Sequence, residues 1–474
     1  MKFALVNIPD HGISGKGYSA PLGLAYIGAV VKSLGYEVKA YDLGANKRLL
    51  RNYYLQADQL FLDSLADYKP DFIGMSCSTT NRINLNFWAG VFKKLLPNVK
   101  IIVGGPHPYF IPEIFLKTAV DVDILVMGEG ELTIADYLKA VSAGDELDAV
   151  KGIAFRNKMG DVIVTPPREV ISNLDEILFP ARDLFPIKDY DIDFGTIVGK
   201  TATMITSRGC GNHCKFCSTT RYWKKVRFRS AKNIVDEIEN VMENFPSIKN
   251  FVFFDDTFTG RRDHALSVCD EILKRKIKIN WGCWSRTDNI DEDFLKVLKE
   301  AGCTTLSFGI ESGNEEMLKV IRKNTTVGNN YRALTLPGKF GILARGTMIA
   351  GMPEEKFKWA IDSLLFMVRP GITYKNLQIS LKTFIFPGTT WEKWFKEKYK
   401  DFSWENIPTR FHRWSFTDPF GNVSLPCYRW GGIQYAALLS LRKLMKNRLF
   451  RKILSFRLVQ ASLKKVASLI PDPS

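Results

Sequence analysis

Three cysteines, Cys210, Cys214 and Cys217, lie close together in the middle of the chain in a CxxxCxxC spacing. Three thiolates from one short loop can bind three irons of a [4Fe-4S] cluster and leave the fourth iron without a protein ligand. An open iron of this kind can bind a substrate or cofactor directly. The spacing therefore predicts a cluster that acts as a catalyst rather than only as an electron carrier.

A structural zinc site or a disulfide is the alternative for these cysteines. Zinc needs a fourth ligand nearby, and His213 lies inside the loop without the spacing of a zinc finger. The other five of the eight cysteines are scattered and do not resemble a disulfide framework, which indicates a reducing compartment. Of these, Cys283 and Cys303 are interpreted as small buried apolar residues of strands.

A buried strand predicted at residues 202–206 runs directly into the cysteine loop, and active sites of α/β barrels are built at strand ends. The strand, the loop and Phe216, an aromatic residue before the third cysteine, resemble those of the radical S-adenosylmethionine (SAM) enzymes. The resemblance implies that SAM binds the open iron and is cleaved to a 5′-deoxyadenosyl radical by an electron from the cluster.

Strand-like and helix-like segments alternate from residue 200 to 390, which predicts an incomplete (β/α)6 barrel of the radical SAM type. Its strands are expected at 202–206, 251–254, 279–284, 305–309, 346–349 and 377–380. Polar or small residues near the strand ends are Asp255, Ser285, Glu311, Ser312, Arg345 and Gly351.

The resemblance implies that these six residues and Phe216 contact SAM. Glu311 would bind its ribose hydroxyls or amino group, Arg345 its carboxylate, and the turn that begins at Gly351 its adenine. An ordinary ion pair at the barrel rim is the alternative for each charged residue.

Residues 1–145 show the same alternation, with strands expected at 3–8, 38–43, 72–76, 101–104 and 124–127. This predicts a Rossmann-like or flavodoxin-like parallel sheet, on which ligands bind at the carboxyl ends of the strands. The ends carry small and polar residues, which let a large flat ligand approach the backbone: Ser76, Ser78, Thr79, Gly104, Gly105, Pro106, His107, Gly128 and Glu129.

Together with residues 21–26, these strand ends resemble the cobalamin-binding domain of the B12-dependent radical SAM enzymes, and the resemblance implies that the nine residues contact cobalamin. The DxHxxG motif of many other B12 proteins is absent, because Asp10 and His11 are adjacent and neither His107 nor His264 has an aspartate two positions earlier. Cobalamin would then be bound without a histidine ligand, or not at all. A domain that only packs on the barrel or binds substrate is the alternative.

The rest of the chain is a predicted linker with a small β ribbon at 146–199, then an aromatic-rich cap and a basic tail at 391–474. The tail from Arg429 to Ser474 carries ten Lys or Arg and one Asp, in a chain of net charge +16, and its apolar residues recur as on amphipathic helices. Such helices lie on an anionic membrane surface or dock on the barrel, and both interpretations stay open. Nucleic acid is a weaker interpretation, since no RNA-binding module accompanies the charge.

The length of 474 residues predicts two or three domains. The N-terminus does not resemble a signal peptide and no apolar run reaches the roughly 20 residues that span a bilayer, so we expect a cytoplasmic protein, with peripheral contact to the inner membrane face as an alternative. The chain does not resemble the tRNA methylthiotransferases, because only Cys77 precedes Cys210 and a second cluster would need more thiolates.

The resemblance implies an enzyme that activates an unreactive C–H bond with an external low-potential electron donor. In the methylating version, methylcobalamin supplies the methyl group and a second SAM restores it. The closest subgroup resembles the anaerobic magnesium-protoporphyrin monomethyl ester cyclases and the hopanoid-modifying or lipid-modifying enzymes, which implies an apolar or lipid-like small molecule as substrate. Radical cyclisation, oxidation or rearrangement without methyl transfer is one alternative. A non-catalytic cobalamin or cluster sensor is another.

Overall fold

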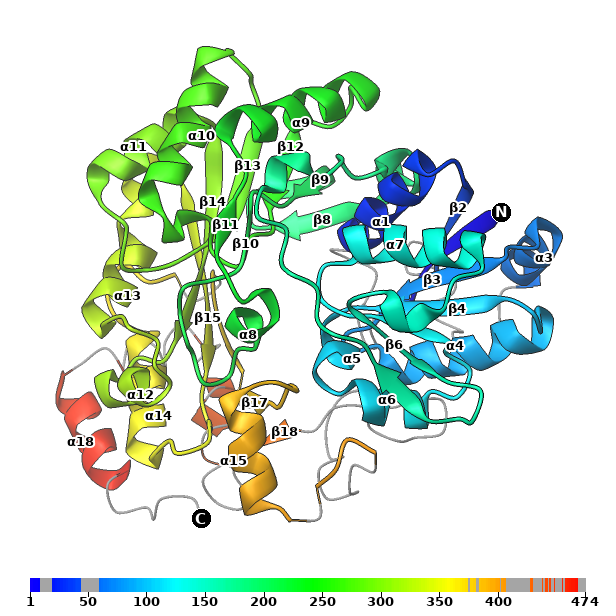
Figure 1. Cartoon of the computed structure of the whole chain (residues 1–474). Coiled ribbons are helices and arrows are strands. Elements are labelled where there is room, and N and C mark those ends of the chain that lie inside the picture. Colours follow the sequence, from blue (N-terminus) through cyan, green and yellow to red (C-terminus); the bar gives the residue numbers. More distant parts are fainter. Residues whose placement is uncertain are drawn as a thin grey trace.

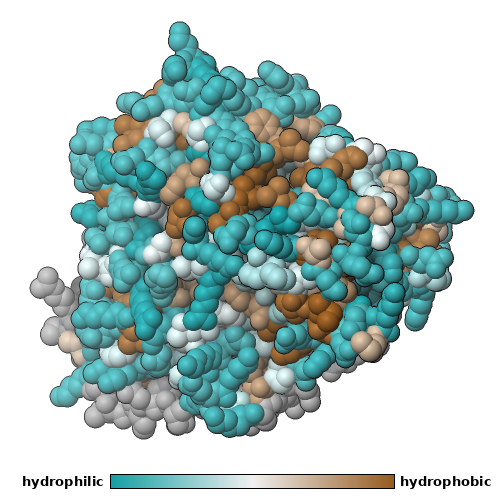
Figure 2. Space-filling model, in the orientation of Figure 1, coloured by the Kyte–Doolittle hydropathy of each residue, from teal (hydrophilic) through white to brown (hydrophobic). Residues whose placement is uncertain are grey.

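The computed structural model describes residues 1–8, 19–43 and 59–400 apart from 374–375 and 381–382, with 402–405 and parts of the chain beyond, chiefly 427–428 and 457–467. Two seven-stranded sheets, each covered by helices, lie side by side (Figure 1). Patches of apolar residues show along the boundary between these two halves on the face in Figure 2. The α/β class expected from the sequence is confirmed.

The N-terminal sheet has a flavodoxin-like core of five parallel strands in the order β2-β1-β3-β4-β5. The strands are β1 (Lys2–Asn7), β2 (Glu37–Asp42), β3 (Phe72–Ser76), β4 (Lys100–Gly104) and β5 (Ile124–Val126). Helices α1 (Leu22–Ser33) and α7 (Gly130–Ala143) pack on one face. Helices α3 (Gln59–Tyr68), α4 (Arg82–Leu95) and α6 (Pro112–Thr118) pack on the other, and α5 (Pro106–Phe110) follows β4 directly. Burial on both faces explains the apolar runs in these strands.

The predicted ribbon forms the antiparallel strands β6 (Ile153–Arg156) and β7 (Val162–Val164). It does not stand alone, because β6 pairs with β5 and so extends the N-terminal sheet.

The second sheet holds the six predicted parallel strands in chain order, confirming the incomplete barrel. They are β9 (Ile197–Met204), β12 (Asn250–Phe253), β13 (Asn280–Ser285), β14 (Cys303–Glu311), β15 (Leu343–Ile349) and β16 (Leu377–Ser380). The associated helices are α9 (Ala231–Asn244), α10 (Arg262–Lys274), α11 (Glu292–Glu300), α12 (Glu315–Val320), α13 (Val327–Thr335) and α14 (Phe357–Phe366). The helices lie outside a curled sheet, as Figure 1 shows.

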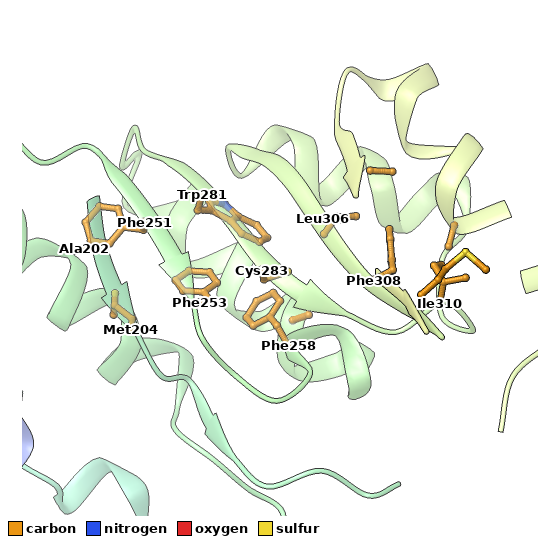
Figure 3. Packing of buried hydrophobic residues seen from close by; sticks show 14 of the residues in the cluster. Ala202, Met204, Phe251, Phe253, Phe258, Trp281, Cys283, Leu306, Phe308 and Ile310 are labelled. Atoms are coloured by element: carbon orange, nitrogen blue, oxygen red, sulfur yellow. The ribbon is translucent and has the colours of Figure 1, made fainter. Parts of the chain in front are cut away.

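Alternate residues of the barrel strands face the helices and form the core. Figure 3 shows this packing, in which Leu306, Phe308 and Ile310 of β14 join the apolar cluster that includes Phe253 and Trp281. The residues between them, at 305, 307, 309 and 311, therefore face the concave side of the sheet.

The base of the half-barrel is closed by a hairpin that the sequence did not predict. Strand β8 (Asp191–Phe194) pairs antiparallel with β9, and its turn reaches β14, where the backbone N–H of Thr196 donates to Thr305 Oγ1 at 3.1 Å. Gly195 is required in this turn because its φ is +75° and a Cβ would lie 2.8 Å from Thr305 Cγ2.

Most aromatic residues of the predicted cap that the structure describes are core residues, while Trp394 and Tyr399 are half-buried against that core. Trp391 and Phe395 of α15 (Thr390–Lys398), together with Phe402 and Trp404, are buried. Phe411, Trp414 and Phe416 lie outside the described residues. Nearby, β17 (Thr383–Phe384) pairs with β18 (Cys427–Tyr428).

In the basic tail, α18 (Arg457–Ala467) packs on α14, and Lys464 Nζ lies 2.7 Å from the Asp362 carboxylate. This helix thus takes the docked position that the sequence left open, while contact with a membrane stays a prediction. In the part of the chain that the structure describes, no helix has the length and apolar character needed to cross a membrane.

Candidate functional site

The cysteine loop begins at a turn that Asp255 holds in place. The Asp255 carboxylate accepts backbone N–H bonds from Thr206 at 2.6 Å and Ser207 at 3.2 Å, and it also accepts the Thr206 hydroxyl. Burial raises the pKa of Asp255 to about 6. The sequence analysis proposed that Asp255 contacts SAM, but the structure directs its carboxylate at the backbone that leads into the loop.

The three cysteines of the loop are partly exposed and free, as a cluster site requires. The loop is compact, since the backbone N–H of Cys217 donates to the carbonyl of Cys214 at 3.1 Å. Burial raises the pKa of the Cys214 thiol to about 11, against the opposing effect of Lys323, and burial also raises the pKa of Cys217. Because metal binds thiolates, loading the cluster must displace these protons.

No group of three or more His, Cys, Asp or Glu among the described residues is arranged around a single metal ion. A [4Fe-4S] cluster does not require such convergence, because each thiolate binds a different iron.

A buried ion pair lies beside the loop at the end of β14. Lys323 Nζ is 2.9 Å from Glu311 Oε1, and both side chains are largely buried. Burial alone would lower the pKa of Lys323, but Glu311 and Cys214 hold it above its ordinary value. The backbone of Glu311 has a φ of +60°, a strained conformation for a residue with a side chain, and such strain is common at functional sites.

Gly309 makes room for this pair. A Cβ at this position would lie 2.4 Å from Glu311 Oε1 and 2.8 Å from Lys323 Nζ. A side chain at position 309 would therefore clash with the ion pair, and glycine lets this pair fold back over the concave face of β14.

The loop also contacts the segment after β15. Lys215 Nζ is 2.8 Å from Glu354, one residue of the turn that begins at Gly351. Gly351 has a φ of +83°, and its N–H donates to the Glu355 carboxylate at 2.6 Å. Phe216 is tilted against Trp391, with ring centres 5.8 Å apart. The structure thus places Phe216, Glu311 and the turn that begins at Gly351 beside the cysteine loop, and their contact with SAM stays a prediction.

Three other predicted SAM residues are placed differently. Ser312 is fully buried, and its hydroxyl forms a hydrogen bond of 2.9 Å with the hydroxyl of Ser363. Ser285 is buried and bonds Thr259. Arg345 lies in the middle of β15, four residues before the strand ends, with its guanidinium 5.7 Å from the ring of Phe194. These contacts with SAM stay predictions.

A cavity of about 470 Å³ lies between the N-terminal sheet and the cysteine loop. Its walls include six of the nine predicted cobalamin residues: Ser76, Gly104, Gly105, Pro106, Gly128 and Glu129. At Gly105, which has a φ of +112°, a Cβ would lie 2.5 Å from the carbonyl oxygen of Cys77. The volume is ordinary for a ligand site, and glycines keep its floor at backbone level, which fits a flat cofactor.

The opposite wall of the cavity comes from the barrel. Arg208 and Ser218, which flank the cysteine loop, line it together with Tyr222 and Trp223 of α8 (Thr219–Trp223). No histidine is among the described residues that line the cavity, in keeping with the absence of the DxHxxG motif.

Ser78, Thr79 and His107 do not line the cavity. Thr79 Oγ1 and His107 Nδ1 lie 3.0 Å apart in the protein interior, and burial together with Arg82 lowers the pKa of His107 well below its ordinary value. Ser78 bonds Thr80 at 2.6 Å. These three residues organise the loop after β3 in the structure, and their contact with cobalamin stays a prediction.

A buried cluster of ion pairs joins the two halves of the molecule at the cavity. Arg208, in the short ribbon of β10 (Ser207–Arg208) and β11 (Arg227–Phe228), bonds Glu129 at 2.6 Å and also bonds Glu131. Arg227 bonds Glu129 at 2.7 Å. On the other side of the loop, the Tyr222 hydroxyl donates to the carbonyl of Gly128 at 3.1 Å. Both ends of the cysteine loop are thus fixed to residues 128–131, and we call this set the loop clamp.

Lys323 and the loop clamp were missed by sequence reasoning. Lys323 follows a short helix rather than a strand, so only the folded chain shows it beside Glu311. No local signal distinguished the two clamp arginines, since Lys215, Arg221, Lys224 and Lys225 lie in the same segment.

Comparison with known proteins agrees with these two sites. Residues 204–367 match the model of the radical SAM superfamily, and residues 11–138 match the B12 binding domain. An uncharacterized methyltransferase of Pyrococcus horikoshii is 32% identical over 380 residues, covering 78% of this chain and 78% of that protein.

The subgroup named from the sequence is also found. The anaerobic magnesium-protoporphyrin IX monomethyl ester cyclase of Rubrivivax gelatinosus is 29% identical over 72% of this chain and 62% of its own length. The hopanoid C-3 methylase of Methylococcus capsulatus is 27% identical over 80% of this chain and 68% of its own length.

The fold matches a solved enzyme over nearly the whole chain. The radical SAM methyltransferase TsrM from Kitasatospora setae superposes with a TM-score of 0.72 at 18% identity, covering 94% of this chain and 89% of that chain. TsrM has also been solved with cobalamin and a [4Fe-4S] cluster bound. The chain therefore belongs to the radical SAM superfamily, as an enzyme of the class that carries a B12-binding domain, with a [4Fe-4S] cluster, SAM and cobalamin as its cofactors.

Proposed function

We propose that this enzyme cleaves SAM reductively to activate a C–H bond of an apolar small molecule, and that it transfers a methyl group to that substrate by way of cobalamin. When bound, the cluster supplies the electron for SAM cleavage, and cobalamin supplies a methyl carrier. Cys210, Cys214 and Cys217 would hold the cluster, while Phe216, Glu311, Lys323 and Gly351 would hold SAM.

The observation that carries the proposal is the position of the cavity. Its walls combine the glycine-rich strand ends of the N-terminal sheet with Arg208 and Ser218, the residues that flank the cysteine loop. A methyl carrier bound there would adjoin the cluster, and proximity of this kind is what transfer between two cofactors and one substrate requires.

Support for an apolar substrate comes from the relatives and from the concave face of the barrel. One relative is named for hopanoid methylation. Two aromatic side chains, Phe254 and Trp284, are each more than a third exposed although they belong to strand ends of the barrel. Radical SAM enzymes generally need an external electron donor, which a chemical reductant replaces in the test below.

The test is anaerobic purification with cobalamin supplied, followed by iron and sulfide analysis, an absorbance spectrum, and product assay after reduction with dithionite. Methyl transfer predicts both 5′-deoxyadenosine and S-adenosylhomocysteine. Formation of 5′-deoxyadenosine without S-adenosylhomocysteine would favour cyclisation, oxidation or rearrangement. Absence of both products would favour a non-catalytic sensor.

The Cys214→Ala variant is expected to lose the cluster absorbance and all SAM cleavage, since one of the three iron ligands is removed. Cys269→Ala, which removes a buried thiol from α10, is the matched control and should keep both. Retention of the cluster and of cleavage in Cys214→Ala would contradict the assignment of the cysteine loop.

A further inference from the structure

Arg345 faces the concave side of the barrel. Its neighbours Ala344 and Gly346 point the other way, toward the helices, since a Cβ at Gly346 would lie 3.1 Å from Leu334 of α13. Arg345 itself lies over the ring of Phe194, and Phe194 belongs to the hairpin at the base of the half-barrel. Because side chains alternate along a strand, these contacts fix its direction.

Trp284 and Ser307 share one layer with Arg345. The register pairs Trp284 with Ser307 across β13 and β14, and Ser307 with Arg345 across β14 and β15, so the three side chains stand on the same face. Trp284 is 37% exposed, and its ring lies 5.7 Å from that of Phe194 in an edge-to-face arrangement. The layer therefore presents the aromatic ring of Trp284, the hydroxyl of Ser307 and the guanidinium of Arg345 on one face of the sheet.

The guanidinium of Arg345 is not neutralised by the protein that surrounds it. Within the described part of the chain it makes no ion pair and no hydrogen bond, and its contact is the ring of Phe194. Phe194 and its turn block access from the base. A partly buried guanidinium whose donors have no partner among the described residues is suited to a bidentate anion.

The position of Arg345 sets it apart from the SAM site. Ser307, its partner on β14, is four residues before Glu311, which corresponds to roughly 13 Å along the strand. Gly309 lies between Ser307 and Glu311 along β14, and the Glu311–Lys323 pair packs over the backbone of Gly309. A molecule that fills the concave face would thus reach from Arg345 to the cysteine loop.

We infer that Arg345, Ser307 and Trp284 form the subsite that holds a carboxylate or phosphate group of the substrate. This inference rests on the proposed function and narrows the substrate class to apolar or aromatic molecules that carry one anionic group. The anionic end binds at Arg345, the apolar body lies against Trp284, and the carbon that reacts lies farther along the concave face, toward the cysteine loop.

The test measures binding of matched probes by titration calorimetry to the cluster-loaded enzyme with SAM present. The probes are 4-phenylbutyrate and its neutral amide, which differ only in charge and in the donor and acceptor atoms of the head group. The wild-type enzyme is expected to bind the carboxylate at least about tenfold more tightly than the amide, as for other charge-assisted hydrogen bonds.

In Arg345→Gln this preference should fall to about one, and Arg345→Lys should keep part of it. Arg262→Gln, which removes an exposed arginine paired with Asp291 on α10, is the matched control and should keep the full preference. The absorbance of the cluster checks that each variant is folded.

Three results would overturn the inference: equal binding of the two probes, no binding of either at millimolar concentration, or an undiminished preference in Arg345→Gln. Weaker SAM binding in Arg345→Gln with the probe preference intact would assign Arg345 to the SAM carboxylate instead. The same preparations are assayed for 5′-deoxyadenosine, so that equal binding of the two probes by a wild-type enzyme that still cleaves SAM rejects this inference alone, whereas absence of cleavage in the wild type rejects the proposed function.

Discussion

Lys323 pairs with the Glu311 carboxylate, and Glu311 and Cys214 hold the pKa of Lys323 above its ordinary value despite burial. We propose that Lys323 is the cation that would pair with the carboxylate of SAM. Arg345, for which the resemblance implied this role, stands deeper on the concave face, level with Ser307 of β14.

Lys323→Met is expected to weaken SAM binding to the cluster-loaded enzyme by about tenfold or more, and to destabilise the fold by about 3 kcal/mol because Glu311 is left buried without a partner. Calorimetric titration with SAM and thermal unfolding measure the two effects. Lys319→Met, on the exposed side of α12, is the control and should change neither. Normal SAM affinity in Lys323→Met would exclude this role.

Glu355 makes the stability dependent on pH. Burial raises the pKa of Glu355 to about 8, although the backbone N–H groups of Met352 and Gly351 oppose this. The folded state then binds a proton more tightly than the unfolded state. The contribution of Glu355 to the free energy of unfolding is therefore full below about pH 4.5 and is lost as the pH rises through about 8.

Glu355→Gln should remove this slope, because the amide oxygen can still accept the N–H groups of Gly351 and Met352. The free energy of unfolding, measured in denaturant at intervals between pH 5 and 8.5, checks the prediction. An equal slope in the variant and the wild type would show that Glu355 is ionised in the folded protein.

At the scale of elements, the ribbon β10–β11 and helix α8 carry the cysteine loop between them. Both are fixed to residues 128–131, at the start of α7, through the loop clamp. The charged side chains of the clamp are buried, so their charges are neutralised by one another rather than by water. The cysteine loop and residues 128–131, which line the cavity, are therefore held together as one unit.

Arg208→Gln should loosen both ends of this unit, and we expect it to weaken hydroxocobalamin binding by about tenfold and to alter the electron paramagnetic resonance signal of the reduced cluster. By reciprocity, the presence of the cluster should strengthen cobalamin binding in the wild type and not in the variant. Lys232→Gln, at an exposed pair on α9, serves as the control. Cobalamin affinity that is independent of the cluster in the wild type would contradict the coupling.

At the scale of the whole molecule, the cavity between the two sheets should couple cobalamin binding to stability. A ligand that binds the folded state at 100 times its Kd stabilises it by about 2.7 kcal/mol. Hydroxocobalamin is therefore expected to raise the Tm of the cluster-loaded enzyme by several degrees.

Ser76→Trp, which fills the cavity from the end of β3, should abolish this rise, whereas Ser33→Trp at the exposed end of α1 should leave it intact. A rise in Ser76→Trp equal to that of the wild type would place cobalamin outside the cavity.

Much of this architecture could be predicted from local sequence. Apolar strand runs, with glycines at their ends, predicted both parallel sheets and their strand positions to within a few residues, because burial on two faces leaves a pattern in each strand by itself. The cysteine spacing identified the cluster site for a similar reason, since all three ligands come from one short loop.

Contacts between distant segments were decided only by the tertiary structure. The hairpin β8–β9 was read as part of a linker, yet its turn closes the base of the half-barrel against β14. Lys323, Arg208 and Glu131 acquire their roles from partners on other elements, and no local pattern records such pairing. The sequence by itself therefore determined the cofactors and the two sheets, while the fold decided which charged residues pair beside the cysteine loop and the cavity, because charge pairing depends on distances between elements that only packing sets.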